Sequence, residues 1–389
     1  MVRNLTVEQI YQIMGDLHNQ ATGRNDIAPV NTSEFVSMAT NTLASGFDNT
    51  LSSLMVLVGR TIFSSRPYER KFKGLEMSGD EWGAITRKIS VASELPEANK
   101  SWDLVDGQSV DHYVVKKPDV LETRYFGSAT FGMKRTYFLN QLNEAFRNEQ
   151  AFGNFVELVT QEASNDWEQY LEELTRSSVA NMIGAKVQAQ NGVIHLLTEY
   201  NSKAGLTTPL TNQTVYQSDN FIPFMKWVYS RIGMISDRMT ERSNLFQIEI
   251  TGKNILRNTP VRDQKIYMST EALREMDSMV LSGTFHDNYL KYADVESVGY
   301  WQAIQKPNEI DVTPVYIDGT GALATGQEEH VENIFGAMFD RNAVGYNIYD
   351  YHINNTPLNA AGDYWNVFYH GRVQLQNDAT EKFVVLLLD

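Results

Sequence analysis

The sequence predicts an α+β fold organised around one very long helix with β-strands packed along one of its faces. Three observations carry this prediction. A helical pattern runs without a proline from Asn148 to about Val187, strand-like alternation occurs on both sides of it, and the chain ends in a segment with strand patterns only. A helix of this extent would be ~60 Å long at 1.5 Å per residue, several times the length of a usual globular helix.

Apolar side chains of the long helix fall in one stripe and polar side chains fall on the opposite side. The stripe contains Phe152, Phe155, Val156, Val159, Ala163, Trp167, Tyr170 and Leu174. The opposite side contains Glu157, Gln161, Glu168, Glu172 and Arg176. Asn148 is the expected N-cap of the helix, with Glu149 in the first turn. Gly184 and Gly192 are possible C-terminal ends of the helix. Because no heptad continues after Leu174, we favour packing against a sheet over a coiled coil.

Residues 1–65 are expected to form an arm of short helices. Thr6 and Gln9 make a capping box for a helix whose apolar face is Val7, Ile10, Tyr11, Met14 and Leu17. After a break at Gly23–Pro29, a second helix starts at Thr32, carries Phe35, Val36, Met38, Ala39 and Leu43, and ends near Gly46. A third contains Leu51, Leu54, Met55 and Val58. None is long enough to be stable alone, so each must pack on its own body or on a neighbour.

Residues 66–137 are predicted to be mainly extended. Ile85, Ile89 and Val91 alternate with polar residues, and His112–Lys116 and Leu121–Phe138 also have strand character. Between them, Glu94–Asp111 is a polar loop without a core of its own. A long irregular excursion of this kind favours a projecting two-stranded arm over a compact domain. An isolated hairpin is marginally stable in water, so this arm is expected to need a partner surface.

Residues 194–333 are predicted to form a separate α/β lobe, and residues 334–389 to return as strands. The lobe contains a helix over Phe221–Met239, strands over Leu245–Ile250 and Lys265–Met268, a helix from Thr270 through Met279, and loops over Ile255–Asp263 and Asp318–Gly326. The returning strands are Ile334–Phe339, Tyr346–Ile353, an alternating run through Trp365, Val367, Tyr369, Val373 and Leu375, and the continuously apolar Phe383–Leu388.

Composition excludes several classes of protein. The 389 residues are 42% hydrophobic, which excludes a disordered chain and allows two or three compact units. No apolar stretch of ~18 residues occurs, and the N-terminus lacks the apolar core of a signal peptide, so we expect a protein made and kept in a cytoplasm, or leaving it without the secretory route, with no membrane contact. The absence of cysteine excludes disulfides and thiolate sites. A net charge of −15 opposes binding to phosphate backbones.

No motif supports catalysis, and we expect no catalytic, cofactor-binding or metal-binding residues. The seven histidines include no pair at helical i,i+4 spacing, and His330 beside Glu328 and Glu329 is interpreted as exposed charge, because neighbours in an extended segment point to opposite faces. The glycine-rich Asp318–Gly326 lacks the phosphate-loop and dinucleotide patterns and is interpreted as a turn. Trp365 and Tyr369 are interpreted as packed sheet residues rather than a sugar platform.

Several phrases along the chain resemble one family. They are Gly59-Arg60-Thr61-Ile62-Phe63, Arg66-Pro67-Tyr68, Lys71-Phe72-Lys73-Gly74-Leu75-Glu76, Phe152-Gly153-Asn154-Phe155, Phe339-Asp340-Arg341-Asn342-Ala343-Val344-Gly345, and the ending Asn377-Asp378 with Phe383-Val384-Val385-Leu386-Leu387-Leu388-Asp389. With the order of the parts, they resemble the major capsid protein of tailed bacteriophages with the Hong Kong 97 coat fold, of the short-tailed type that infects Gram-positive hosts.

The resemblance implies an N-terminal arm (1–65), an extended hairpin loop region (66–137), the spine helix of a peripheral domain (138–193), an axial domain (194–333), and returning strands shared by the two domains (334–389). It implies a subunit that forms pentamers and hexamers of an icosahedral virion shell, assembled in the bacterial host cytoplasm around double-stranded DNA that is enclosed without sequence-specific binding. A separate scaffolding protein and a portal are the implied partners. The alternatives are an encapsulin-like compartment shell or a glycosidase that uses a pair of carboxylates.

Overall fold

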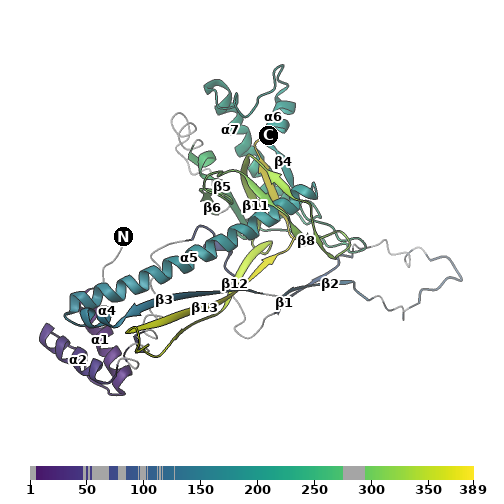
Figure 1. Ribbon diagram of the computed structural model, residues 1–389. Coiled ribbons are helices and arrows are strands. Elements are labelled where there is room, and N and C mark those ends of the chain that lie inside the picture. The colour runs from purple at the N-terminus through teal and green to yellow at the C-terminus, as the bar shows by residue number, and fades with distance from the viewer. Residues whose placement is uncertain are drawn as a thin grey trace.

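The computed structural model describes residues 6–46, 50, 53–54, 70–77, 85–94, 96, 102, 104–111, 113, 115, 117–126, 128–274 and 294–389. One helix, α5 (Glu149–Gln188), runs diagonally through the molecule, with small helices at its start and a helix-covered sheet near its end (Figure 1). This confirms the predicted long helix. The Asn148 side chain caps it by accepting the backbone N–H of Ala151 at 2.8 Å, as predicted.

Neither predicted glycine is the residue at which α5 ends. Gly184 lies inside the helix, where a Cβ atom would come within 2.5 Å of the Val312 Cγ1 atom. This glycine therefore permits close approach of the 312–314 segment, and the helix continues to Gln188 with Ala189 as its C-cap. Gly192 follows four residues after the helix with a φ of +77°, and a side chain there would also meet the carbonyl oxygen of Phe383.

The first sheet lies along α5 and consists of the antiparallel strands β12 (Val344–Asn355), β13 (Tyr364–Asn377) and β3 (Ala129–Phe138), in that order. Alternate residues point toward α5, and the Phe131 ring stacks on the Trp167 ring with centroids 4.1 Å apart. Trp365, Val367, Tyr369 and Val373 are fully buried on this face, as their alternation predicted.

The second sheet is buried on both faces. Its strand order is β4 (Val193–His195), β14 (Phe383–Leu387), β11 (Ile334–Asp340), β5 (Gln264–Ser269) and β6 (Asp294–Val298). One face carries a ladder of stacked rings from Tyr267, Phe339 and Phe383 in the same core as α5. The other face packs under α6 (Leu196–Ala204) and α7 (Ser218–Thr240). The prediction of a buried last strand is confirmed.

The N-terminal helices pack on the start of α5, so the arm docks on its own body. α1 (Val7–Thr22) begins with the predicted Thr6–Gln9 capping box and ends at Gly23, and α2 covers Thr32–Ala44. The Phe35 ring lies 5.7 Å from the Phe152 ring in a core that also includes residues of α4 (Leu139–Ala145). Most of the third predicted helix lies outside the described residues; within it, Leu54 is helical and buried.

The segment predicted over Leu121–Phe138 is extended, but it forms two strands with different partners, because β2 (Val120–Phe126) pairs with β1 (Ile85–Val91) whereas β3 pairs with β13. Another predicted strand is wrong. Leu245–Ile250 is not a strand: Phe246 has a left-handed φ of +69°, which breaks extended backbone, and the segment contains turns.

Short elements, most of them in the lobe, escaped prediction because three residues carry no periodicity. They are β7 (Ile310–Val312), β8 (Val315–Ile317), β9 (Leu323–Thr325), β10 (Glu329–Val331), and the 3-10 turns Lys73–Leu75 and Val261–Asp263. β9 lies within the predicted loop Asp318–Gly326. The helix expected after β5 begins at Thr270, and its part beyond Arg274 lies outside the described residues. None of the helices in the described ranges combines the length and apolar character needed to cross a bilayer.

Candidate assembly surfaces

The β1–β2 hairpin projects from the body on the side opposite the N-terminal helices (Figure 1). Its strands pair antiparallel from Ile85 opposite Phe126 to Val91 opposite Val120. Several apolar side chains of the hairpin and of the segment joining its strands are exposed: Ile89, Val91, Val120, Trp102, Val105, Tyr113 and Val115. Trp102, Tyr113 and Val115 are each 88–90% exposed. Such a concentration of apolar surface on a projecting element is typical of an interaction surface.

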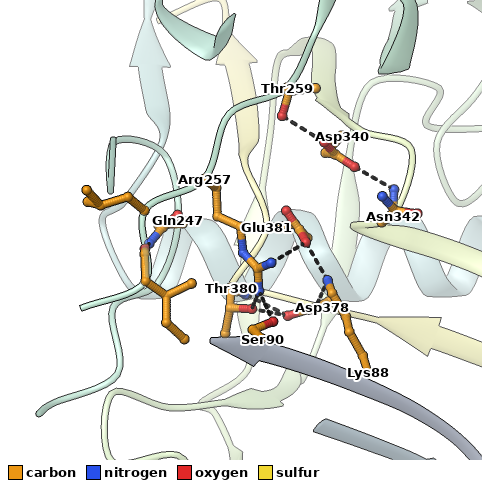
Figure 2. A network of polar contacts seen from close by, with 12 residues as sticks. Lys88, Ser90, Gln247, Arg257, Thr259, Asp340, Asn342, Asp378, Thr380 and Glu381 are labelled. Atoms are coloured by element: carbon orange, nitrogen blue, oxygen red, sulfur yellow. Dashed lines mark hydrogen bonds and ion pairs between the residues drawn. The ribbon is translucent and has the colours of Figure 1, made fainter. Parts of the chain in front are cut away.

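A cluster of charged and hydroxyl side chains, the hairpin anchor, fixes β1 to the body (Figure 2). It consists of Lys88, Ser90, Arg257, Asp378, Thr380 and Glu381. The Lys88 ammonium donates to Asp378 Oδ2 at 2.5 Å and also to Glu381 Oε1. The Arg257 guanidinium pairs with Glu381 at 3.2 Å and donates to Ser90 Oγ at 2.9 Å. The anchor thus joins one strand to two loops that lie far from it in sequence.

The pKa values of the two carboxylates of the anchor are shifted in opposite directions. Burial alone would raise the pKa of Asp378, but the nearby Lys88 ammonium and the hydrogen bonds donated by the Thr380 hydroxyl and backbone N–H lower it. Burial raises the pKa of Glu381, and the positive charges of Lys88 and Arg257 only partly oppose this. Of the two carboxylates, Asp378 is therefore the one that keeps its negative charge more readily.

Lys186 of α5 lies close to the anchor and is fully buried. Its ammonium donates to the carbonyl oxygens of Phe246 at 2.9 Å and Ala379 at 3.2 Å. Burial lowers the pKa of Lys186 to about 7, although the charges of Asp378 and Glu381 oppose the shift. The lysine connects the end of the spine helix to the loop that carries Asp378.

Lys186 should give the protein a measurable pH dependence. Between pH 7 and about 10 the unfolded chain binds one proton more at this residue than the folded chain does, so folded stability rises with pH. Relative to Lys186→Met, the free energy of unfolding of the unmodified protein should rise by on the order of 1 kcal/mol per pH unit in this range. Urea unfolding at pH 7, 8 and 9 measures this difference. The exposed Lys134→Met should leave the pH dependence intact, and identical dependence in Lys186→Met would contradict the assignment.

A second charge cluster, the spine lock, consists of the buried Arg70, Glu168, Glu172 and Arg176 and the exposed Glu76. Arg70 pairs with Glu168 at 2.9 Å and with Glu76 at 2.7 Å, and Arg176 pairs with Glu172 at 2.6 Å. The Glu172 carboxylate also accepts the backbone N–H of Lys71 at 2.9 Å. The chain segment at residues 70–77 is thereby tied to the middle of α5.

The spine lock corrects the prediction for the polar side of the long helix. Glu168, Glu172 and Arg176 are at most 5% exposed, because the segment around Phe72 and the chain at Tyr300 cover this side. The Arg176 guanidinium lies 3.7 Å from the centroid of the Tyr300 ring and 5.2 Å from that of the Phe72 ring. The side chains of Glu157 and Gln161 lie outside the described residues.

His330 makes surface ion pairs with residues other than its sequence neighbours Glu328 and Glu329. Its Nδ1 atom contacts Asp311 of the paired strand β7, and its Nε2 atom lies 2.8 Å from Glu332 Oε1. Hydrogen bonds that the His330 ring donates to Asp311 and Glu332 raise the pKa of His330. Donor atoms of Glu309, His330 and Glu332 lie within 4.8 Å of one another, but both imidazole nitrogens are already paired and the cluster is at the surface. We therefore assign no chemical reaction to this cluster.

The other candidates for chemistry are structural. Asp318 accepts the backbone N–H of Thr320 at 2.8 Å within the tight turn between β8 and β9. Trp365 and Tyr369 are completely buried against α5, and no sugar-binding platform is formed by them. Sequence reasoning missed the hairpin anchor and the spine lock, because the pairs that tie their separate segments together lie about a hundred residues or more apart and follow no spacing rule.

Comparisons with known proteins give a single answer. The model of the family described as "Phi29-like phage major capsid protein" matches residues 13–387. No curated protein matches the chain. A capsid structure of Staphylococcus phage Andhra is similar with a TM-score of 0.53 and 11% identity, covering 82% of this chain and 84% of that one. A structure of head fiber and inner core protein gp22 of native bacteriophage P68 gives a TM-score of 0.51 and 12% identity, covering 82% and 85%. At these identities the structures show a shared fold.

Proposed function

The chain belongs to the Phi29-like phage major capsid protein family, whose members form phage head shells, and we propose that its copies are joined into pentamers and hexamers chiefly by the β1–β2 hairpin. The observation that carries this proposal is the exposed apolar surface of a hairpin whose base is rigidly attached to the body. When the base is rigid, apolar contacts at the far end of the hairpin hold the two subunits at a fixed angle. A flexible base would lose part of the binding free energy to ordering.

We assign one assembly role to each part of the chain. The spine helix (138–193) and the sheet along it would be the rigid plate of the subunit. The hairpin region (66–137) and the arm (1–65) would contact neighbouring subunits, the axial lobe (194–333) would meet its copies around the capsomer axis, and the returning strands (334–389) would join plate and lobe. The stacked Tyr267, Phe339 and Phe383 rings support the last role, because they connect strands of the lobe to the core of α5.

Membership of this family also suggests which other partners take part and where assembly occurs. We propose that a separate scaffolding protein and a portal take part in assembly, that assembly occurs in the cytoplasm of a bacterial host, Gram-positive by resemblance, and that the shell encloses DNA and performs no catalysis. The net charge of −15 supports a shell that does not bind DNA tightly, because the negative charges of protein and phosphate repel each other over a screening length of ~8 Å at physiological salt. The family match favours a phage head over an encapsulin-like compartment or a glycosidase.

The hairpin role is tested by a triple substitution, Trp102→Ser, Tyr113→Ser and Val115→Ser. These side chains are 88–90% exposed, so the subunit should fold with an unchanged unfolding midpoint. The substitutions remove apolar area that would contact the neighbouring subunit. Each contact between subunits should lose roughly 1.4 kcal/mol or more of binding free energy, so the yield of closed shells should fall at least about tenfold. Sedimentation and negative-stain microscopy measure the yield.

A matched control distinguishes the hairpin from apolar surface in general. Leu323→Ser, in the β8–β9 turn region, removes a side chain that is 72% exposed and lies outside the hairpin. It should lower the shell yield far less than the triple substitution does, because it removes one side chain of the lobe and none of the hairpin. Normal shells from the triple variant, or an equal loss in both variants, would remove the support for hairpin-mediated assembly.

A further inference from the structure

We propose that His352 and His370 form a binding site for one divalent transition-metal ion, of the Zn²⁺ or Ni²⁺ class. The two residues face each other across β12 and β13, on the side of the three-stranded sheet that points away from α5. This face is not covered within the described chain: the His352 side chain is 48% exposed, and His370 is half-buried between its neighbours. The site goes beyond the role of the chain as a shell subunit.

The separation of the two rings fits chelation of one ion. The centroids of the His352 and His370 imidazoles lie 5.2 Å apart. Two imidazoles bound to one tetrahedral ion through N–metal bonds of ~2.0–2.1 Å place their centroids about 5 Å apart. The direct cross-strand register holds both rings on the same face without any rearrangement of the backbone.

Each ring has a nitrogen free to coordinate. His352 Nδ1 lies 3.2 Å from Asp350 Oδ1, which favours the proton on Nδ1 and leaves a lone pair on Nε2. A carboxylate on the far nitrogen is the usual partner of a metal-bound histidine. His370 makes no hydrogen bond to the described residues, and the edge of its ring nearest Gly132 of β3 is the Nδ1–Cε1 edge. Nε2 is therefore the His370 nitrogen that lies farther from β3, and we assign it as the ligand atom.

The surroundings provide room and select the kind of ion. The two histidines line a surface pocket of about 250 Å³ together with Thr130, Phe131, Asp350, Gly371 and Arg372. This volume holds an ion with its remaining water ligands. Asp350 supplies negative charge, and Arg372, whose Nε atom is 3.7 Å from Asp350 Oδ2, opposes it in part. Lys134, opposite Phe368 in the register, is the next cation on this face. Neutral imidazoles select Zn²⁺, Ni²⁺ or Cu²⁺ over Mg²⁺ and Ca²⁺.

The ion would connect β12 and β13 directly beside the register shift between Ile348 and Asp350. Because the two rings are brought together only by folding, binding should stabilise the folded state. His330 is less suited to this role, since both of its nitrogens are paired with carboxylates.

Calorimetric titration of ZnCl₂ into the untagged full-length protein at pH 7.5 tests the proposal, with the thermal unfolding midpoint as a second readout. We expect one high-affinity equivalent per chain, unaffected by excess Mg²⁺, and a higher midpoint with Zn²⁺. His352→Gln and His370→Gln should each weaken binding at least about tenfold, and Asp350→Asn should weaken it about 10–100-fold. Cobalt added in place of zinc should give visible absorption bands that are lost in both histidine variants.

His330→Gln is the matched control, because it removes another exposed histidine with carboxylate neighbours. It should leave zinc binding unchanged. The proposal is overturned if no zinc binds at millimolar concentration, if His330→Gln abolishes binding, if magnesium displaces the zinc, or if both glutamine variants bind as well as the unmodified protein. Unchanged unfolding midpoints of the variants without zinc exclude loss of folding as the cause.

Discussion

Replacing Arg70 with methionine is expected to lower the free energy of unfolding by about 3–5 kcal/mol, because it removes the cation that pairs with the buried Glu168 carboxylate. The Arg70 side chain is 1% exposed and pairs with Glu168, which is 2% exposed. Methionine matches the length of the aliphatic part but provides no charge, so the Glu168 carboxylate would remain buried without the guanidinium that pairs with it. Urea unfolding followed by tryptophan fluorescence measures the loss, since Trp167 neighbours Glu168 in α5.

Arg87→Met provides the comparison. Arg87 also pairs with a glutamate, Glu122, but its side chain is 62% exposed. Solvent screens such a pair, so the unfolding midpoint should hardly move. Equal losses for Arg70→Met and Arg87→Met would show that the spine lock contributes no more than surface charge does.

Replacing Lys88 with methionine is expected to have the largest effect on assembly of any single substitution outside the exposed apolar surface of the hairpin. It removes the ammonium shared by Asp378 and Glu381, which are 1% and 7% exposed, and leaves Arg257 as the remaining cation of the hairpin anchor. Because Lys88 is 23% exposed, the loss of stability should lie near the lower end of the range for a broken buried pair, about 3 kcal/mol. The hairpin should also lose its fixed orientation.

Hydrogen exchange of the β1 amides and the yield of shells measure these two effects. Exchange from Ile85 to Val91 should become faster in Lys88→Met, while exchange in β14 stays slow. Lys253→Met is the control, because Lys253 pairs with Asp119 beside the same hairpin but at a more exposed position. It should leave shell yield close to normal. A Lys88→Met protein with unchanged exchange and full shell yield would contradict the role of the anchor.

The long helix and the last strands could be predicted because their patterns extend over many residues. Forty residues of α5 give an unambiguous period, and the alternation from Trp365 to Val373 specifies one buried face. Three-residue strands such as β7 and β10 give no period, and they form because their partners supply the hydrogen bonds. The strand predicted over Leu245–Ile250 failed because nothing in its composition reveals the left-handed backbone at Phe246.

The candidate surfaces were predicted less completely than the fold. That residues 66–137 include a projecting hairpin needing a partner followed from a loop without a core, and the exposed Trp102 and Tyr113 agree with this. The charges that hold the hairpin were not predictable: Lys88 and Asp378 are 290 residues apart, and each alone resembles ordinary surface charge. The same applies to Glu168 and Glu172, which were assigned to the polar side of the helix and are buried by a distant segment.

We propose that copies of this chain build a shell through contacts made by the hairpin. Negative-stain microscopy with sedimentation, on the purified protein alone and then with a candidate scaffolding protein, tests it most directly. We expect closed uniform shells or stable five- and six-fold rings in at least one of the two conditions. A persistent monomer in both would contradict it.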